Sequence, residues 1–271
     1  MNTVGIIPAR LQSSRLPRKL LLKDSGKPLL QYAWEAASKA SLLSEVIVAT
    51  DSDEIAAVAR GFGARVEMTG QHPSGSDRIA EVVQRCCKDA DLVINIQGDE
   101  PELDPRVIDR LVSLMLKHPQ AEMGTLACPI TSTAVLEDRG CVKVVTAADS
   151  RALYFSRLPI PCFRDGEPGD LLASDWRSEL SGGDETVGPA PLISSPWLLH
   201  IGIYAYRPEF LLAFTQMPPS RLEQLESLEQ LRALEAGASI LVEVVPHRSV
   251  GIDTSADYAA FLERERQRRT G

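Results

Sequence analysis

The sequence predicts an α/β protein with a mostly parallel central sheet flanked by helices. In residues 1–98, short apolar stretches alternate with helical stretches of about 10–15 residues, a pattern typical of parallel strands joined by right-handed crossovers. The composition is 44% hydrophobic over 271 residues, enough for a large core. Charged segments directly follow several apolar stretches, at the sheet edge where open α/β proteins bind ligands.

The first half of the chain contains the clearest alternation. Strands are expected at 4–7, 45–50, 64–68 and 91–98, because these stretches are apolar and bounded by polar turns. The helices expected between them cover 29–40, 52–63 and 75–90. Ser52 is the expected N-cap of the second helix, and the third is expected to be capped near Ser76.

The second half is less regular. Strands are expected at 123–130, within 141–161, at 196–207 and at 239–246, and a closing helix at 254–269. Leucines at 222, 225, 228, 231 and 234 predict one amphipathic helix over 220–237, ended by Gly237.

No clean linker divides the chain, so we expect a single domain over 1–271. Within it, 164–195 forms an acidic excursion rich in glycine and proline. Its 164–191 part holds seven acidic residues and two arginines, a net charge of -5. This composition predicts a poorly ordered segment that acts as a lid.

Composition excludes several classes of function. A net charge of -8 argues against a nucleic-acid surface. The chain has no run of 18 apolar residues, so a membrane span is not expected. The five cysteines are scattered, form no C-x-x-C pair and do not cluster with histidines, which predicts reduced thiols in a cytoplasmic protein without structural zinc.

A basic loop follows the first expected strand. Arg10, Arg15, Arg18 and Lys19 lie within ten residues of an otherwise acidic chain. A solvated surface is the commonest explanation for such a run. However, the loop lies at the ligand-binding edge and is stiffened by prolines, and arginine and lysine are the side chains that bind polyphosphate.

Two acidic positions follow other strands. Asp99, in "QGDEP", would be either a helix N-terminal residue or a ligand of Mg²⁺, which favours one or two carboxylates together with substrate phosphates. Asp253, in "GIDT", would be either the N-cap of the last helix or a second metal ligand, since Thr254 offers an alternative cap.

Seven motifs in order carry a resemblance to a known family. They are "IIPARLQSSRLPRKLL" (6–21), "HPSGSDR" (72–78), "INIQGDEP" (94–101), "ALYFSRLPIP" (152–161), "HIGIYAYR" (200–207), "LESLEQLR" (225–232) and "VGIDT" (250–254). Together they resemble the 3-deoxy-manno-octulosonate (Kdo) cytidylyltransferases over nearly the whole chain. Arg18 departs from the family, which often has glycine there, and Asp77 replaces a common glutamate.

The resemblance implies a GT-A-like nucleotide-diphospho-sugar transferase fold and formation of CMP-Kdo and diphosphate from CTP and Kdo, for lipopolysaccharide biosynthesis. It also implies Mg²⁺ and a homodimer. Arg10, Lys19 and Asp99 would be catalytic, and Asp99 and Asp253 would bind the metal. The residues implied to bind CTP are Ala9, Arg10, Ser13, Lys19, Ser74, Arg78 and Gln97. Those implied to bind the sugar acid are Gln97, Arg157, His200, Tyr204, Glu229 and Gln230.

The residues alone allow other interpretations of the sugar-acid set. Arg157 has the planar cation that a carboxylate needs, yet most arginines form surface salt bridges. Glu229 and Gln230 would face outward from the leucine stripe, and His200 would also suit a core. A related or amino-substituted sugar acid is an alternative acceptor, and a catalytically inactive nucleotide-binding regulator is an alternative of another class.

Overall fold

The computed structural model describes residues 1–13, 15–164, 167–172, 195–246 and 251–270. They divide into two compact units. Unit 1 comprises Met1–Ser113, Ile203–Thr215 and Ser249–Gly271, and unit 2 comprises Leu114–Gly202 and Gln216–Arg248. The single domain over 1–271 stays a prediction. Most of the expected lid at 164–195 lies outside the described residues.

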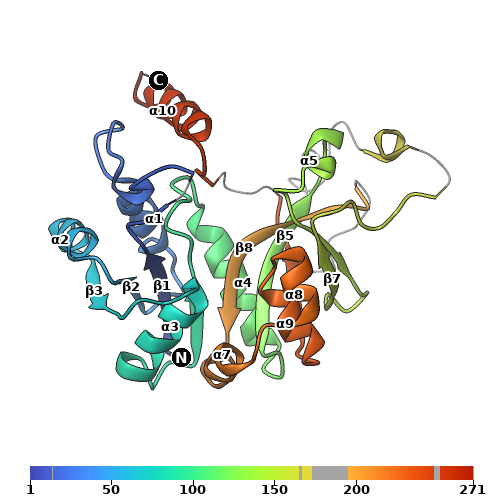
Figure 1. Ribbon diagram of the computed structural model, residues 1–271, viewed down its shortest axis with the longest axis horizontal. Helices are drawn as coiled ribbons and strands as arrows, with labels where there is room; N and C mark the ends of the chain where they lie inside the picture. Colours follow the sequence, from blue (N-terminus) through green and yellow to red (C-terminus); the bar gives the residue numbers. More distant parts are fainter. Residues whose placement is uncertain (14, 165–166, 173–194, 247–250, 271) are drawn as a thin grey trace. The chain divides into compact units, whose positions relative to one another are not determined.

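Unit 1 is built on a mostly parallel sheet (Figure 1). Strand β1 (Thr3–Ala9) lies between β2 (Glu45–Thr50) and β4 (Leu92–Asn95) and is parallel to both, and β3 (Arg65–Met68) continues the sheet beside β2. The end of β8 (Leu198–Tyr206) pairs antiparallel with β4, giving the order β3-β2-β1-β4-β8. The predicted strands and their parallel pairing are therefore confirmed, with β8 added in the opposite direction.

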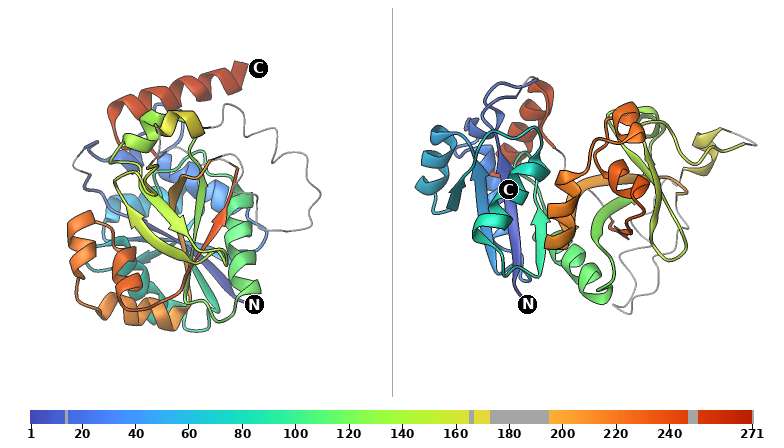
Figure 2. Two further views of the ribbon diagram at one scale, coloured as in Figure 1. Left: turned by 90° about the vertical axis from the view of Figure 1, so that its right-hand side faces the viewer. Right: turned by 60° about the horizontal axis from the view of Figure 1, so that its bottom comes forward.

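Most helices of unit 1 lie beside this sheet, and the C-terminal helix lies beyond the strand ends (Figures 1 and 2). The helices are α1 (Leu29–Ala37), α2 (Asp53–Gly61), α3 (Gly75–Cys86), α7 (Pro208–Gln216) and α10 (Ser255–Thr270), while α4 (Pro105–Lys117) runs on into unit 2. The Ser52 hydroxyl accepts a hydrogen bond from the Ile55 N–H, which confirms it as the cap of α2. The cap of α3 is Ser74 rather than Ser76, because Gly75 and Ser76 already lie in the first helical turn.

The basic loop after β1 is anchored by an apolar cluster. Leu16 is buried with Leu29 of α1, with Ile252 just before α10, and with Tyr258 and Phe261 of α10. Beyond it the chain forms a short 3-10 helix, η1 (Lys19–Leu21). Burying one leucine side chain contributes about 1.5–3 kcal/mol, enough to hold a charged loop against the unit.

Unit 2 combines parallel and antiparallel strand pairing. Strands β5 (Met123–Pro129) and β9 (Ile240–Val244) are parallel, whereas β6 (Lys143–Thr146) is antiparallel to both β7 (Ala152–Ser156) and the start of β8. The remaining elements are helices α5 (Thr133–Glu137), α8 (Arg221–Glu226) and α9 (Gln230–Glu235) and the 3-10 helix η2 (Pro168–Leu171).

The single helix predicted over 220–237 is wrong, because α8 and α9 are separate. Ser227 adopts a left-handed conformation (φ 52°), which ends α8 and turns the chain. Leu225 is consequently 72% exposed, while Leu231 is fully buried. The regular leucine spacing predicted one helix because it carries no sign of the single backbone torsion at Ser227 that separates α8 from α9.

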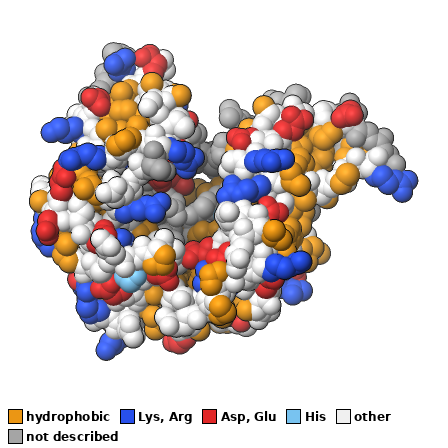
Figure 3. All heavy atoms as spheres, viewed as in Figure 1, with side chains coloured by type: hydrophobic (Ala, Val, Ile, Leu, Met, Phe, Trp, Pro, Cys, Tyr) orange, Lys and Arg blue, Asp and Glu red, His pale blue; other side chains and the backbone are white. Residues whose placement is uncertain are grey.

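Charges on the described surface are mixed. The face in Figure 3 shows lysine and arginine interspersed with aspartate and glutamate. In the part of the chain that the structure describes, we find no helix with the length and apolar character needed to cross a membrane.

One ion pair links α8 to α9. The Arg232 guanidinium donates to both carboxylate oxygens of Glu223, at 2.8 and 2.6 Å. Burial by itself raises the pKa of Glu223, but the bonds from Arg232 and from the Ser220 N–H outweigh burial and lower it below its usual value. Ser220 and Glu223 also form a capping box at the start of α8.

We predict that Glu223→Gln lowers the free energy of unfolding by about 1.5–3 kcal/mol at pH 7, the usual contribution of bonds to a charged group. Because the folded-state pKa is lowered, this contribution is complete above the unfolded pKa and is lost as pH falls through the folded pKa. Urea unfolding at pH 7 and pH 3 should therefore show a difference between wild type and variant that shrinks in acid. The exposed control Glu137→Gln should change stability by less than about 0.5 kcal/mol.

Candidate active site

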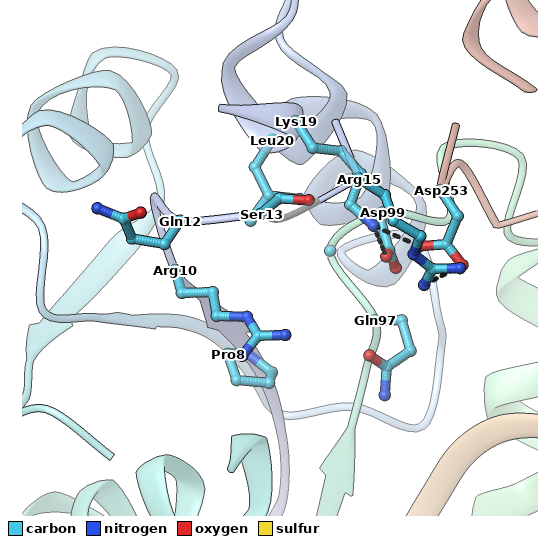
Figure 4. Close-up of a pocket in the computed structure, with 11 residues that line it drawn as sticks. Pro8, Arg10, Gln12, Ser13, Arg15, Lys19, Leu20, Gln97, Asp99 and Asp253 are labelled. Atoms are coloured by element: carbon cyan, nitrogen blue, oxygen red, sulfur yellow. Dashed lines mark hydrogen bonds and ion pairs between the residues drawn. The ribbon is translucent and has the colours of Figure 1, made fainter. Parts of the chain in front are cut away.

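A polar pocket in unit 1 lies at the carboxyl ends of β1 and β4 (Figure 4). Arg10 enters it from the loop after β1, and Gln97 and Asp99 enter it from the segment after β4. The residues that line it are Pro8, Arg10, Gln12, Ser13, Arg15, Lys19, Leu20, Gln97, Gly98, Asp99 and Asp253. The pocket therefore joins three of the segments that the sequence marked as polar.

Lys19 lies between two carboxylates. Its Nζ donates to Asp99 Oδ2 at 2.5 Å and to Asp253 Oδ1 at 2.9 Å. Because the 2.5 Å and 2.9 Å bonds meet at one nitrogen, the two oxygens lie at most 5.4 Å apart. Arg15 approaches the other oxygen of Asp253 at 3.0 Å. Two cations thus face two anions in one pocket.

The contacts explain why Asp99 and Asp253 face the pocket instead of capping helices. Asp104 accepts the Arg106 N–H at the start of α4, and Thr254 accepts the Asp257 N–H at the start of α10. The Ile252 N–H donates to the Asp99 carbonyl at 2.9 Å, which ties the two acidic segments together. Neither carboxylate is therefore needed as a helix cap, and both face the cations of the pocket.

The pKa of Lys19 is raised above its ordinary value. Burial of the side chain lowers this pKa, but the charges and hydrogen bonds of Asp99 and Asp253 outweigh burial. Lys19 is only 11% exposed. It is therefore a fixed cation at neutral pH.

This donor set suits a hard divalent cation. Mg²⁺ takes oxygen ligands and often uses only one or two carboxylates, completing its shell with water and phosphate. Asp99 and Asp253 meet that requirement, and the Lys19 ammonium shows that the position between them favours positive charge. Within the described residues, no group of three or more histidine, cysteine or acidic side chains is arranged to hold a metal ion.

Three expected CTP residues do not line the pocket. Ala9 is buried in β1, and the Ser74 hydroxyl is engaged as the cap of α3. The Arg78 side chain is buried, with bonds to Thr69 Oγ1 and the Gly70 carbonyl and an ion pair with Asp51 at 3.2 Å. Arg78 therefore shapes the segment between β3 and α3.

Arg15, expected only as one cation of the basic loop, and Gln12, for which no role was expected, both line the pocket. Arg15 belongs to the same basic run as Lys19, so that run was the available signal. Gln12 has no distinguishing signal, because a single amide in a polar loop is common.

Arg157 lies in unit 2, just after β7, and its guanidinium binds backbone. Its nitrogens donate to the carbonyls of Glu226 at 2.6 Å, Arg139 at 2.9 Å and Ser227 at 3.2 Å. The Glu226 carboxylate in turn accepts the Arg157 N–H at 2.9 Å and the Ser156 hydroxyl at 2.7 Å. Arg157 therefore joins the end of β7 to the turn between α8 and α9.

Gln230 and Glu229 follow that turn. The expectation that both face outward is wrong for Gln230, which is 4% exposed because α9 starts after the break at Ser227 and turns this side chain inward. Among the described residues, no group accepts from its buried Nε2. Glu229 lies 3.9 Å from Arg232.

The two remaining sugar-acid candidates lie on β8. His200 belongs to unit 2, where its Nε2 lies 3.0 Å from Thr125 Oγ1 and its ring meets Phe155 edge-on. Tyr204 belongs to unit 1 and lies beside Tyr206, with ring centroids 6.0 Å apart.

Comparison with known proteins first identifies the class of protein to which this chain belongs. Residues 4–240 match the family model described as cytidylyltransferase. The fold agrees, since a solved cytidylyltransferase from Leptospira borgpetersenii, only 16% identical, aligns with a TM-score of 0.58 over 97% of this chain and 85% of its own.

Full-length relatives narrow the class. A 3-deoxy-manno-octulosonate cytidylyltransferase of Rhodopirellula baltica is 45% identical over 97% of this chain and 98% of its own length. One from Geobacter sulfurreducens is 44% identical over 97% and 99%. A solved CMP:2-keto-3-deoxy-manno-octonic acid synthetase complexed with CTP is 36% identical, with a TM-score of 0.84 over 99% of this chain and all of its own. The chain belongs to the 3-deoxy-manno-octulosonate cytidylyltransferase family and is accordingly an enzyme, as the seven sequence motifs indicated.

We predict that the His200 imidazole is neutral at pH 7. Burial lowers its pKa below the ordinary value. A titration of its ring carbon signal by NMR should therefore show no step between pH 6 and pH 8. A His200 midpoint at or above ~6.5 would contradict this prediction.

Proposed function

We propose that this enzyme transfers the cytidylyl group of CTP to Kdo and releases diphosphate. The observation that carries the proposal is the gathering of Arg10, Lys19, Gln97, Asp99 and Asp253 in one pocket of a chain from this family. The fold alone would not identify the acceptor, whereas full-length relatives of the same name support Kdo.

Arg10, Ser13 and Lys19 are the proposed phosphate ligands. Arg10 reaches into the pocket, and Lys19 supplies a fixed positive charge. Arginine binds phosphate through two parallel hydrogen bonds and lysine through its point charge. Around the cytidine we propose Ala9 and Ser74, with Arg78 holding the β3–α3 segment in shape.

Asp99 and Asp253 are the proposed Mg²⁺ ligands. The metal, when bound, would neutralise phosphate charge and lower the pKa of the attacking hydroxyl. Their separation of at most 5.4 Å suits one ion or an adjacent pair.

Arg157, His200, Tyr204, Glu229 and Gln230, together with Gln97, are the proposed acceptor ligands. A sugar acid offers one carboxylate and several hydroxyls, which require a planar cation and a set of hydrogen-bonding groups. The buried Nε2 of Gln230 is a donor that a sugar hydroxyl would satisfy. The neutral His200 ring offers a donor or an acceptor without a charge.

In the proposed reaction, the 2-hydroxyl oxygen of Kdo attacks the α-phosphorus of CTP. A new bond joins this oxygen to phosphorus, the bond to the diphosphate oxygen breaks, and the hydroxyl proton passes to solvent. Lys19 and Arg10 stabilise the charge on the departing diphosphate. The protein therefore contributes mainly by positioning and electrostatics, and no side chain needs to act as a general base.

We further propose that the enzyme works in the cytoplasm as a homodimer that uses Mg²⁺, in lipopolysaccharide biosynthesis. Light scattering tests the dimer, with a monomeric mass contradicting it. The decisive test of function is diphosphate release from CTP, Mg²⁺ and Kdo. Faster turnover on an amino-substituted Kdo would transfer the proposal to that acceptor, and no turnover on either would overturn it.

We predict that Lys19→Ala lowers kcat/KM by at least ~10²-fold, the usual cost of removing one charge-stabilising donor. Initial rates of diphosphate release measure it. The exposed Lys23→Ala in the same region is the matched control and should keep wild-type kinetics. Wild-type kinetics in Lys19→Ala would make the basic loop a solvated surface.

We predict that Asp99→Asn abolishes most activity and weakens binding of Mn²⁺, used as a probe for Mg²⁺, in the presence of CTP. Asp253→Asn should lower the rate and weaken the metal dependence to a smaller extent, since Asp99 lies in the short segment after the central strand β4. Calorimetric Mn²⁺ titrations measure binding independently of activity. Asp53→Asn on exposed α2 is the control, and unchanged Mn²⁺ binding in both pocket variants would remove these residues from the metal site.

A further inference from the structure

Lys143 is a fully buried cation in unit 2. It lies on β6 opposite Ser156 of β7, and its exposure is 0%. Its Nζ donates to the carbonyls of Asp138 at 2.9 Å, Cys141 at 2.5 Å and Arg157 at 2.6 Å. Among the described residues, these three hydrogen-bond partners are all backbone carbonyls, so the contacts provide no paired carboxylate.

Burial, together with the nearby Arg157 charge, lowers the pKa of Lys143 below its ordinary value, but the geometry of its contacts matches the protonated form. An ammonium has three N–H donors, whereas a neutral amine has two and a lone pair. Three carbonyl oxygens at 2.5–2.9 Å match the ammonium, since a lone pair would repel one of them. Burying a charge is costly unless it is fully hydrogen-bonded, and here each donor has an acceptor.

Lys143 and Arg157 bind the same turn. Within 138–141, Lys143 takes the carbonyls of Asp138 and Cys141, and the Arg157 guanidinium takes the intervening carbonyl of Arg139. Lys143 also holds the carbonyl of Arg157 itself. The position of the Arg157 guanidinium therefore depends on Lys143 in two ways. Lys143 holds the backbone of Arg157, and it also holds the 138–141 turn that the guanidinium contacts.

The same contacts extend to the acceptor candidates on α9. Arg157 holds the carbonyls of Glu226 and Ser227, the last residue of α8 and the residue with the left-handed backbone. Glu229 and Gln230 follow two and three residues later. A shift of Arg157 would therefore move the segment from which these two side chains project.

We propose that Lys143 is a positioning residue for the acid acceptor, holding Arg157 in place through three backbone carbonyls and placing its ammonium charge beside the guanidinium. This inference rests on the proposed function, because it takes Arg157 as the residue facing the Kdo carboxylate. Lys143 is the cation buried inside the protein, and Arg157 is the cation that would bind the Kdo carboxylate. Such an arrangement favours an acidic sugar over a neutral one, since the buried charge cannot be screened by solvent.

The test is Lys143→Met, which keeps an unbranched apolar chain of similar length and removes the charge and the three donors. We expect kcat/KM for Kdo to fall by about 10–10²-fold, the size of effect seen when a binding group is misplaced by about 1 Å. KM for Kdo should account for most of the loss, and the Kd for CTP should change by less than about twofold, because the CTP pocket lies in unit 1.

Two controls separate positioning from stability and from net charge. Ile240→Ala removes buried volume from β9 and lowers the melting temperature without touching the 138–141 turn. Lys117→Met removes an exposed positive charge from the same unit. Both should keep the wild-type KM for Kdo.

A double-mutant cycle then tests whether Lys143 acts through Arg157. In an Arg157→Gln background, Lys143→Met should add less than about twofold to KM, since the group it positions is already gone. If Lys143→Met does not fold, Lys143→Arg replaces it. That variant keeps the charge but does not place three donors on one nitrogen, and it should raise KM for Kdo by at least about threefold.

If Lys143→Met has the wild-type KM for Kdo, the proposed role of Lys143 is wrong. It is also wrong if the effects of Lys143→Met and Arg157→Gln on KM multiply fully in the double-mutant cycle. Either result leaves the proposed function unchanged. A wild-type enzyme that makes no CMP-Kdo would overturn the proposed function and this inference with it. The two failures are therefore distinguishable in the same assay.

Discussion

The ammonium of Lys19 lies between two carboxylates, and the rest of the pocket depends on that contact. Asp99 and Asp253 lie 80 and 234 residues from Lys19 in the chain, yet both bond to its Nζ. Two carboxylates this close repel each other unless a cation lies between them. If Lys19 turned toward phosphate, the pair would need another cation. Binding of the nucleotide and of the proposed metal would therefore favour each other.

Apolar packing in unit 1 brings these charges together. Leu16 of the basic loop and Ile252, next to Asp253, belong to one buried cluster with the start of α10. The parallel strands β1 and β4 end side by side, which places Arg10 near Gln97 and Asp99. The chain thus uses ordinary burial to hold a polar site that would not assemble through its own charges.

Local patterns predicted the strands of unit 1, their parallel pairing and the cap at Ser52, because each depends on neighbours in the sequence. The basic loop, Asp99 and Asp253 were also found, since charge after an apolar strand is visible directly. The break at Ser227 and the burial of Gln230 were not, because one left-handed torsion redirects α9 and leaves no trace in the leucine spacing. The buried position of Lys143 was equally hidden, since a lysine in an apolar strand gives no sign that its acceptors will be backbone carbonyls.

Arg18 shows how a sequence departure is accommodated in the basic loop. It has a left-handed backbone (φ 57°) at the start of η1, a conformation that glycine adopts without steric cost and other residues adopt at about 1–2 kcal/mol. Its side chain forms an ion pair with Glu54 of α2, which offsets part of that cost. We therefore expect the residues at positions 18 and 54 to vary together. A lineage that loses the acid at 54 is expected to return to glycine at 18, whereas β-branched residues at 18 should be rejected in every background.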